Sequence, residues 1–304
     1  MKRLLEEIIN ECSHYTKLGR VASYIPELKK ANPDNFGICV IDKSGEYLAG
    51  DYDKPFTVQS IIKPLILLLA LMDNGTERVK LLCGVEATGK PFDAFNYSDL
   101  ALTSEHINPM INAGAIALCT LIRGETHTEK FERLLSLART LSGNPSLSVN
   151  QEVYLSEKET GYKNRALAYM LKAYKMIDCD VDELLDVYFK ACSVEVSCRD
   201  LARIAFVLAN HGRLPDADRL LIPAEYARTV NAVMAICGMY DGSGEFALNV
   251  GIPAKSGVGG GIMASVPSRM GIGAFSPALD RKGNSLAGVK ALELLSSKIG
   301  LSIF

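Results

Sequence analysis

The chain has 304 residues, of which 48% are hydrophobic and 22% are charged, which is the composition of a globular protein with ample material for a core. The formal net charge is −2, the sequence pI is about 6.1 and no basic block is present, so the charge pattern argues against nucleic acid or an anionic membrane as a partner. The histidines are scattered without the spacing of metal ligands, which argues against a metal site.

The first segment, residues 1–20, alternates charged and apolar residues at helical spacing, without the apolar core and cleavage site of a signal peptide. The most apolar run, residues 61–72, is too short to span a bilayer and contains Lys63 and Pro64. The eight cysteines form no C-x-x-C pair and lie mostly in apolar segments, as free thiols in a reducing compartment do. These patterns predict a cytoplasmic protein.

The next expected elements are two strands that form a hairpin over residues 34–51. From Pro64 to about Ala235 the apolar residues recur at three- and four-residue spacing, which predicts mainly helices. The clearest helical segments are 129–143, 164–176, 181–193 and 198–212. Strand character returns over 245–257, 260–267 and 270–277, and a closing helix is expected over 285–300.

Strands near both ends of the chain therefore bracket a long helical middle. The simplest arrangement is an α/β (α+β) protein in which the terminal segments share one antiparallel sheet, covered by the first and last helices. The predicted sheet domain comprises residues 1–63 and 236–304, and residues 64–235 form an inserted all-helical domain.

A serine and a lysine stand three residues apart in FTVQSIIKP, residues 56–64, where the apolar helix begins. Pro64 is tolerated only in the first helical turn, so the helix is expected to start close to Ser60. Ser60 then lies at the positive end of the helix, with Lys63 one turn on and on the same face. A lysine whose pKa is lowered there can accept the proton of a serine nucleophile. On its own, the S-x-x-K pattern favours the alternative of a serine cap beside a solvated lysine.

A second motif, PAKSGVGGG, places Lys255, Ser256 and Gly257 after a predicted strand. It resembles the K-T-G element that faces S-x-x-K in serine β-lactamases and penicillin-binding proteins. The alternative is a strand end followed by a glycine-rich turn. The S-D-N element of those enzymes is missing, because SDL at Ser98 fails at its third position and YKN at residues 162–164 matches only in part.

The motifs of the serine-dependent glutaminases are similar, in order, to VQSIIKP, NPMINAGAI, SEKETGYKNRALA, DVYFKACSVEV, CGMYDGSGEFA and GIPAKSGVGGGI. The resemblance extends from about Tyr24 to residue 285. It implies the serine β-lactamase-like fold and the hydrolysis of L-glutamine to L-glutamate and ammonia through a serine acyl-enzyme, without metal or cofactor. It also implies an active site between the sheet domain and the helical domain, and assembly into a homodimer or homotetramer.

Matched residue by residue, the resemblance implies that Ser60 is the nucleophile, Lys63 its partner base and Tyr240 a proton relay. It implies an oxyanion hole formed by the backbone N–H groups of Ser60 and Val258, and a main-chain donor suits the charge that develops on the amide oxygen. The implied substrate-binding residues are Tyr24, Ser60, Asn112, Glu157, Asn164, Tyr188, Tyr240 and Val258, with Lys255, Ser256 and Gly257 in support.

Structural alternatives exist for several of these residues. Asn112 could be a turn residue and Asn164 a helix cap, Tyr188 could be core, and Glu157 could belong to a solvated charge run. The resemblance favours the functional interpretation of each.

Two other functions stay open. A β-lactamase or D,D-peptidase on the same fold is disfavoured by the missing S-D-N element and signal peptide. A non-catalytic binding module is disfavoured because it would not need the serine, both lysines and the tyrosines together.

Overall fold

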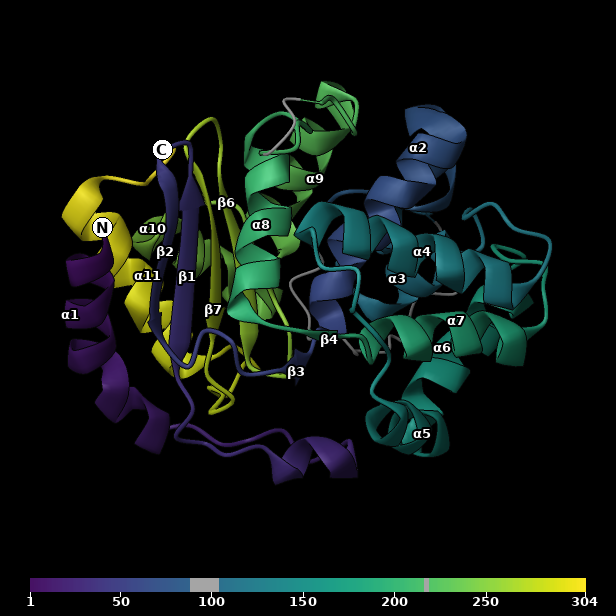
Figure 1. Cartoon of the computed structure of the whole chain (residues 1–304). Coiled ribbons are helices and arrows are strands. Elements are labelled where there is room, and N and C mark those ends of the chain that lie inside the picture. The colour runs from purple at the N-terminus through teal and green to yellow at the C-terminus, as the bar shows by residue number, and fades with distance from the viewer. Residues whose placement is uncertain (88–103, 216–218) are drawn as a thin grey trace.

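The structure is a computed structural model, and it describes residues 1–87, 104–215 and 219–304 (Figure 1). The SDL pattern at Ser98 lies outside the described residues. A five-stranded antiparallel sheet has the strand order β2-β1-β7-β6-β5, so both ends of the chain contribute to one sheet, as predicted. Its strands are β1 (Gly37–Asp42), β2 (Gly45–Gly50), β5 (Ala254–Ser256), β6 (Gly261–Val266) and β7 (Met270–Phe275).

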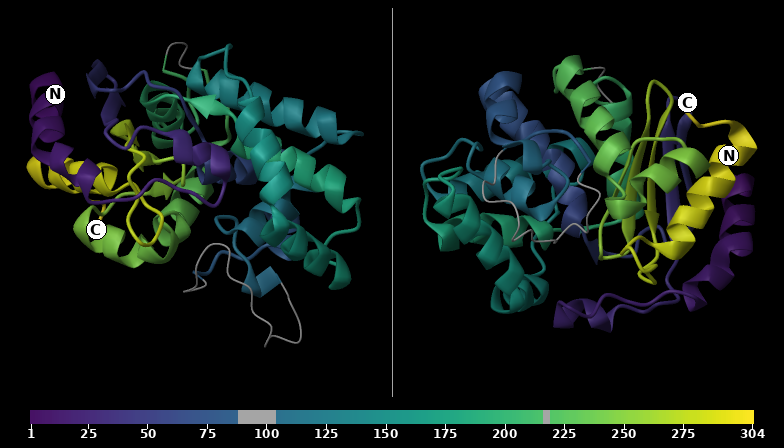
Figure 2. Two further views of the ribbon diagram at one scale, coloured as in Figure 1. Left: turned by 90° about the horizontal axis from the view of Figure 1, so that it is seen from below. Right: turned by 180° about the vertical axis from the view of Figure 1, so that it is seen from behind.

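Helices surround the sheet and extend to one side of it (Figures 1 and 2). The α-helices in the described ranges are α1 (Lys2–Cys12), α2 (Lys63–Leu82), α3 (Asn112–Cys119), α4 (His127–Ser142), α5 (Gln151–Thr160), α6 (Tyr162–Ala173), α7 (Val181–Cys192), α8 (Cys198–Ala209), α9 (Ala224–Cys237), α10 (Ser243–Asn249) and α11 (Leu286–Ile299). Short 3₁₀ turns lie at Ser13–Lys17, Pro26–Lys30, Gln59–Ile62, Ser104–His106 and Tyr240–Gly242. None of the helices described is long and apolar enough to cross a membrane.

The sheet separates two apolar layers, because alternate residues of a strand point to opposite faces. One face, which includes Ile38 and Val40, packs against α1 and α11. The other face is covered by α8, which lies across β7, β6 and β1 (Figure 1). A Cβ atom at Gly273 of β7 would collide with the carbonyl oxygen of Cys198, so glycine at that position allows α8 to lie close to the sheet.

A second, two-stranded sheet marks the point where the chain leaves the first sheet and enters α2. In it β3 (Phe56–Thr57) pairs with β4 (Glu195–Val196), and the N–H of Val58 donates to the carbonyl of Val194 over 2.8 Å. The sequence analysis assigns no strand at β4, because two residues are too few to show a period. The pairing holds the turn before α2 against the segment between α7 and α8.

The hairpin of β1 and β2 and the helices α4, α6, α7, α8 and α11 confirm the predictions made from periodicity. The strand predicted from residue 245 is wrong in its first part, where Ser243–Asn249 form α10. The hydroxyl of Ser243 donates to the carbonyl of Tyr240 and accepts from the N–H of Met239, so the turn at Tyr240 continues into a helix. All eight cysteines are free thiols, as predicted.

Helix α8 lies within residues 64–235, the segment predicted to form a helical domain, and yet it packs on the sheet. Helices α3, α4, α6 and α7 pack among themselves on the far side of α8 (Figure 1). The division of the chain at residues 63 and 236 stays a prediction.

Candidate active site

Ser60 lies in the 3₁₀ turn Gln59–Ile62, directly before α2, and it is buried. The helix begins at Lys63, with Pro64 in its first turn, as the missing N–H of proline requires. Gln59 has a φ of 48°, in the left-handed region that residues other than glycine rarely adopt. Strain of this kind is typical of functional turns, and here it stands next to the serine.

Lys63 is fully buried, and its ammonium donates two hydrogen bonds to α3 and the residues before it. Lys63 Nζ lies 2.7 Å from Oδ1 of Asn112 and 3.2 Å from the carbonyl oxygen of Met110. Burying an amine is costly unless it is hydrogen-bonded, so these acceptors keep the Lys63 side chain in place within the site.

Tyr240 opens the turn Tyr240–Gly242 with a φ of 55°, a second strained residue beside the serine. Burial raises the pKa of its phenol above the usual range, and hydrogen bonding to the Ser60 hydroxyl and the backbone of Val258 opposes that rise. The phenol is therefore within reach of both the candidate nucleophile and the candidate oxyanion hole.

Lys255 lies beneath the ring of Tyr240, with its Nζ 4.3 Å from the ring centroid. Its ammonium donates to the carbonyl oxygens of Gly238 over 3.0 Å and Ser256 over 2.6 Å. Burial, followed by repulsion from Lys63, lowers the pKa of Lys255. The side chain of Lys255 thus packs against one face of the Tyr240 ring.

Gly257 and Gly259 bring the end of β5 against the serine turn. A Cβ at Gly257 would lie 2.7 Å from the carbonyl oxygen of Val58, and one at Gly259 would collide with the carbonyl oxygen of Thr57. Val258, between them, is buried. The glycines therefore allow the backbone at Val258 to approach the turn that carries Ser60.

Three polar residues from three helices meet beside Lys63. Asn112 begins α3, and its Nδ2 donates to Oδ1 of Asn164 on α6 over 2.8 Å. The hydroxyl of Tyr188, on α7, donates to Oδ1 of Asn112 over 3.3 Å. All three side chains are buried, so their neutral donors form a preorganised polar lining.

Glu157, on α5, is a buried carboxylate and not part of a solvated charge run. Burial raises its pKa to about 8, although a hydrogen bond from Gln59 and the charge of Lys63 both act to lower it. Its Oε2 atom has no hydrogen-bond partner among the residues that the structure describes. A buried carboxylate oxygen left without a partner is suited to a cationic group of a ligand. The sequence analysis missed Gln59, whose only signal was its position beside Ser60.

Tyr24 is not part of this buried cluster, because 56% of its surface is exposed. Its neighbours Ala22, Ile25 and Leu28 pack on a small apolar cluster that includes Tyr240 and Val258. The N-terminal segment therefore lies against the site, while the side chain of Tyr24 stays at the surface.

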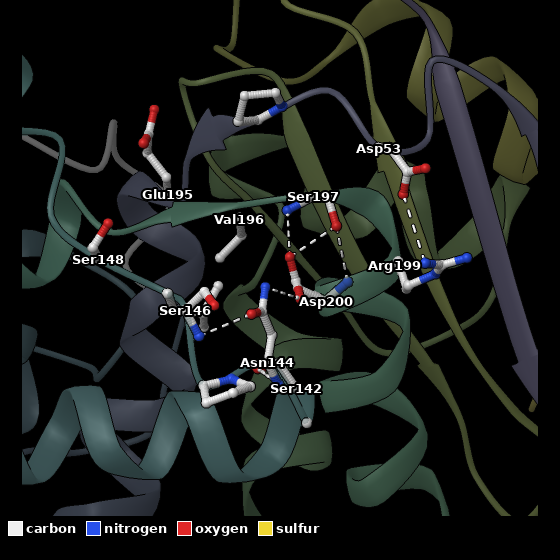
Figure 3. A pocket seen from close by; sticks show the side chains of 14 residues that line it. Asp53, Ser142, Asn144, Ser146, Ser148, Glu195, Val196, Ser197, Arg199 and Asp200 are labelled. Carbon is white, nitrogen blue, oxygen red and sulfur yellow. Dashed lines mark hydrogen bonds and ion pairs between the residues drawn. The ribbon is translucent and has the colours of Figure 1, made fainter.

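A polar pocket of about 630 Å³ opens elsewhere, between Asp53, the loop 142–148 and the start of α8 (Figure 3). Asp200 accepts hydrogen bonds there from the backbone and hydroxyl of Ser197, both over 2.8 Å, and from Asn144 over 3.1 Å. The bond from the Ser197 backbone belongs to the capping box of α8, and the other two donors complete the hydrogen bonding of the Asp200 carboxylate. None of the predicted site residues lines this pocket. Among the described residues no group of His, Cys, Asp and Glu could hold a metal ion.

Comparisons with known proteins agree on the class of protein. The glutaminase family profile matches residues 19–304. The glutaminase of Clostridium tetani is 54% identical over the full length of both chains, and that of Clostridioides difficile is 53% identical over 99% of this chain and 98% of its own. A Bacillus subtilis glutaminase, solved as a covalent complex with 5-oxo-L-norleucine formed from 6-diazo-5-oxo-L-norleucine, superimposes with a TM-score of 0.91 at 39% identity, covering 100% of this chain and 99% of that one.

The mixed α/β fold, with its antiparallel sheet and surrounding helices, is thus that of bacterial glutaminases of known structure. The chain belongs to the glutaminase family, and it is a hydrolase of the class EC 3.5.1.2.

Proposed function

We propose that this protein hydrolyses L-glutamine to L-glutamate and ammonia through an acyl-enzyme on Ser60. The observation that carries the proposal is the position of Ser60, one turn before the buried amine of Lys63, next to the phenol of Tyr240 and against the glycine-flanked backbone at Val258. The covalent complex of the Bacillus subtilis relative with a compound derived from 6-diazo-5-oxo-L-norleucine supports a nucleophilic mechanism. We also assign the sheet and its helices to the serine β-lactamase-like fold.

Acylation begins when the hydroxyl of Ser60 attacks the side-chain carbonyl carbon of glutamine. Lys63 or Tyr240 takes the hydroxyl proton, because a serine nucleophile needs an adjacent group that can act as its base. The backbone N–H groups of Ser60 and Val258 hold the oxyanion of the tetrahedral intermediate. The amide nitrogen then receives the proton, the C–N bond breaks, and ammonia leaves a glutamyl ester on Ser60.

In deacylation, water takes the place of the ammonia that has left and acts as the nucleophile. The same base removes a proton from water, and the resulting hydroxide attacks the ester carbonyl in the same oxyanion hole. The ester C–O bond breaks, the proton returns to Ser60, and glutamate leaves. No group beyond the side chains and backbone described above is needed for the proton transfers.

The groups attached to the α-carbon of glutamine fix its orientation. The α-ammonium pairs with Glu157, whose Oε2 atom has no partner within the described part of the chain. The Nδ2 groups of Asn112 and Asn164 supply neutral donors for the α-carboxylate, and Tyr188 donates to it when its hydroxyl turns away from Oδ1 of Asn112. Tyr24 contributes from the N-terminal segment. The proposal also includes a homodimer or homotetramer, which the family resemblance implies, and a cytoplasmic location, which the sequence patterns predict.

The decisive experiment measures ammonia release from L-glutamine by the purified protein and by Ser60→Ala. Intact-mass spectrometry after incubation with 6-diazo-5-oxo-L-norleucine follows the nucleophile independently. We expect wild-type turnover and one covalent adduct, and neither in Ser60→Ala. An adduct on Ser60→Ala, or hydrolysis of a chromogenic cephalosporin without any ammonia release from glutamine, would exclude the proposed function.

A further inference from the structure

A cluster of charged groups joins α5 to α7 next to the substrate-binding residues but outside them. At its centre the carboxylate of Asp186, on α7, accepts a short hydrogen bond from the hydroxyl of Tyr154 and one of 2.9 Å from Lys158, both on α5. Lys190 adds a third contact of 2.7 Å from within α7, and a ring nitrogen of His127 lies 3.8 Å away. The reaction proposed above uses none of these groups.

The Asp186 carboxylate is enclosed, since its side chain is 9% exposed. Burial on its own raises the pKa of this group. The hydrogen bonds from Lys190, Tyr154 and Lys158 outweigh that effect and lower the pKa to about 2. An exposed ion pair contributes little to stability, but a buried carboxylate with several donors holds its partners in one geometry.

The positions of these residues along the two helices connect the cluster to the site. Tyr154 and Lys158 lie three residues before and one residue after Glu157, and Asp186 lies two residues before Tyr188. Helix α5 has ten residues, a length that is marginal without tertiary support. Its first turn is held by the Asn150 cap, and the hydrogen bonds from Tyr154 and Lys158 to Asp186 hold the helix against α7.

We propose that Asp186 is a positioning residue, which fixes α5 against α7 and so sets the spacing between Glu157 and Tyr188. This inference rests on the proposed function, because it matters to the reaction only if those two residues bind the substrate. Loss of this contact lets the carboxylate of Glu157 and the hydroxyl of Tyr188 shift apart, which weakens substrate binding. The turn that carries Ser60 stays in place.

A second buried carboxylate provides a matched control. Asp73, on α2, accepts from Arg133 over 2.7 Å and from the N–H of Arg123 over 2.8 Å, and it is as buried as Asp186. It lies on α2 roughly 15 Å along the helix from Lys63, at 1.5 Å per residue. Asp73→Asn therefore breaks a comparable network away from the substrate-binding residues.

The experiment compares the KM and kcat for glutamine, and the melting temperature, of the full-length variants Asp186→Asn, Asp186→Glu, Tyr154→Phe and Asp73→Asn. We expect Asp186→Asn to raise KM roughly tenfold with kcat nearly unchanged, the pattern of lost uniform binding. Tyr154→Phe should move KM in the same direction by a smaller factor, and Asp186→Glu should recover most of the loss. Asp73→Asn should lower the melting temperature and leave KM alone.

A KM in Asp186→Asn that is no higher than in Asp73→Asn would overturn the inference. If Asp186→Asn does not fold, Tyr154→Phe decides in its place, and an unchanged KM there has the same meaning. Glu157→Gln is measured in the same series. A wild-type protein that releases no ammonia would remove the proposed function and the inference with it. Normal kinetics in Glu157→Gln would leave the hydrolysis in place and remove only the substrate-binding role of Glu157, on which the inference rests.

Discussion

Lys63 donates from Nζ to Oδ1 of Asn112 over 2.7 Å, so the amine proposed as a base and an amide proposed to bind substrate share one hydrogen bond. The same oxygen of Asn112 accepts from the hydroxyl of Tyr188. Proton transfer and substrate binding are therefore coupled through a single side-chain oxygen. A substitution at Asn112 should affect both, and its kinetic signature depends on the charge that it introduces.

We predict that Asn112→Asp loses more in kcat than Asn112→Ser. A carboxylate beside Lys63 would stabilise the protonated form of the lysine and so remove the base, whereas serine introduces no charge next to it. The loss in kcat should be at least ~10²-fold, the usual scale for removing a general base. Steady-state kinetics of the two variants check this. Equal values of kcat would mean that Lys63 does not take the proton.

Direct substitution at the two candidate bases gives a second prediction. Lys63→Met keeps most of the side-chain volume and should reduce kcat by at least ~10²-fold. Tyr240→Phe removes only the hydroxyl next to Ser60 and should also reduce kcat. The acidic limb of the pH–rate profile belongs to the pair, so it should change in both variants. A wild-type rate in Lys63→Met would leave the proton transfer to Tyr240.

Features that depend on neighbouring residues in the sequence can be predicted from the sequence, whereas features that depend on contacts between distant segments cannot. The β1–β2 hairpin and helices α4 and α11 follow from local periodicity, and the position of Pro64 locates the start of α2 within a few residues. The proposed site residues on α3, α6 and α7 meet in the structure, and their assignment came from motif resemblance.

Features that depend on packing were not predictable in this way. The pairing of Phe56 with Val196 joins residues far apart in the chain through two-residue strands. The burial of Glu157 contradicts its polar neighbours, because only one face of α5 packs inward. The Asp186 cluster forms because α5 and α7 are in contact, and the spacing of residues within either helix does not predict it. Tyr24, assigned by resemblance, lies at the surface because its segment packs through Ile25 and Leu28.

The oxyanion hole gives a third prediction, which separates the amide of Val258 from its side chain. Val258→Ala keeps the N–H and should be mild, whereas Val258→Pro removes the N–H. Loss of one such donor typically costs about 3 kcal/mol, or roughly two orders of magnitude in rate. Measurements of kcat should be paired with melting temperatures, which identify any variant that is unfolded. Equal kcat values in two folded variants would assign the effect to side-chain packing.

The raised pKa of Glu157 gives a fourth prediction, on stability. Its carboxyl group binds a proton more tightly in the folded state, with a pKa of about 8, than in the unfolded chain. Stability from this group is therefore fully present below the unfolded pKa near 4.5 and is lost as the pH rises through 8. Glu157→Gln cannot titrate, so its free energy of unfolding should fall less between pH 5 and about 8 than that of the wild type. Denaturant unfolding at several pH values checks this, and parallel curves would place Glu157 in contact with solvent.

The fifth prediction concerns the recognition of glutamine by Glu157. The α-ammonium must lose water on entering the site, and the unpartnered Oε2 atom of Glu157 can replace that water. Removing one partner of a buried charge pair costs about 2–5 kcal/mol, so Glu157→Gln should lower kcat/KM for glutamine by at least roughly tenfold. Glu159→Gln, an exposed change on the same helix, should have no effect. A glutamine analogue without the α-amine should be a poor substrate for the wild type and should barely distinguish wild type from Glu157→Gln. If both glutamate variants turned over glutamine like the wild type, the α-ammonium would need another partner.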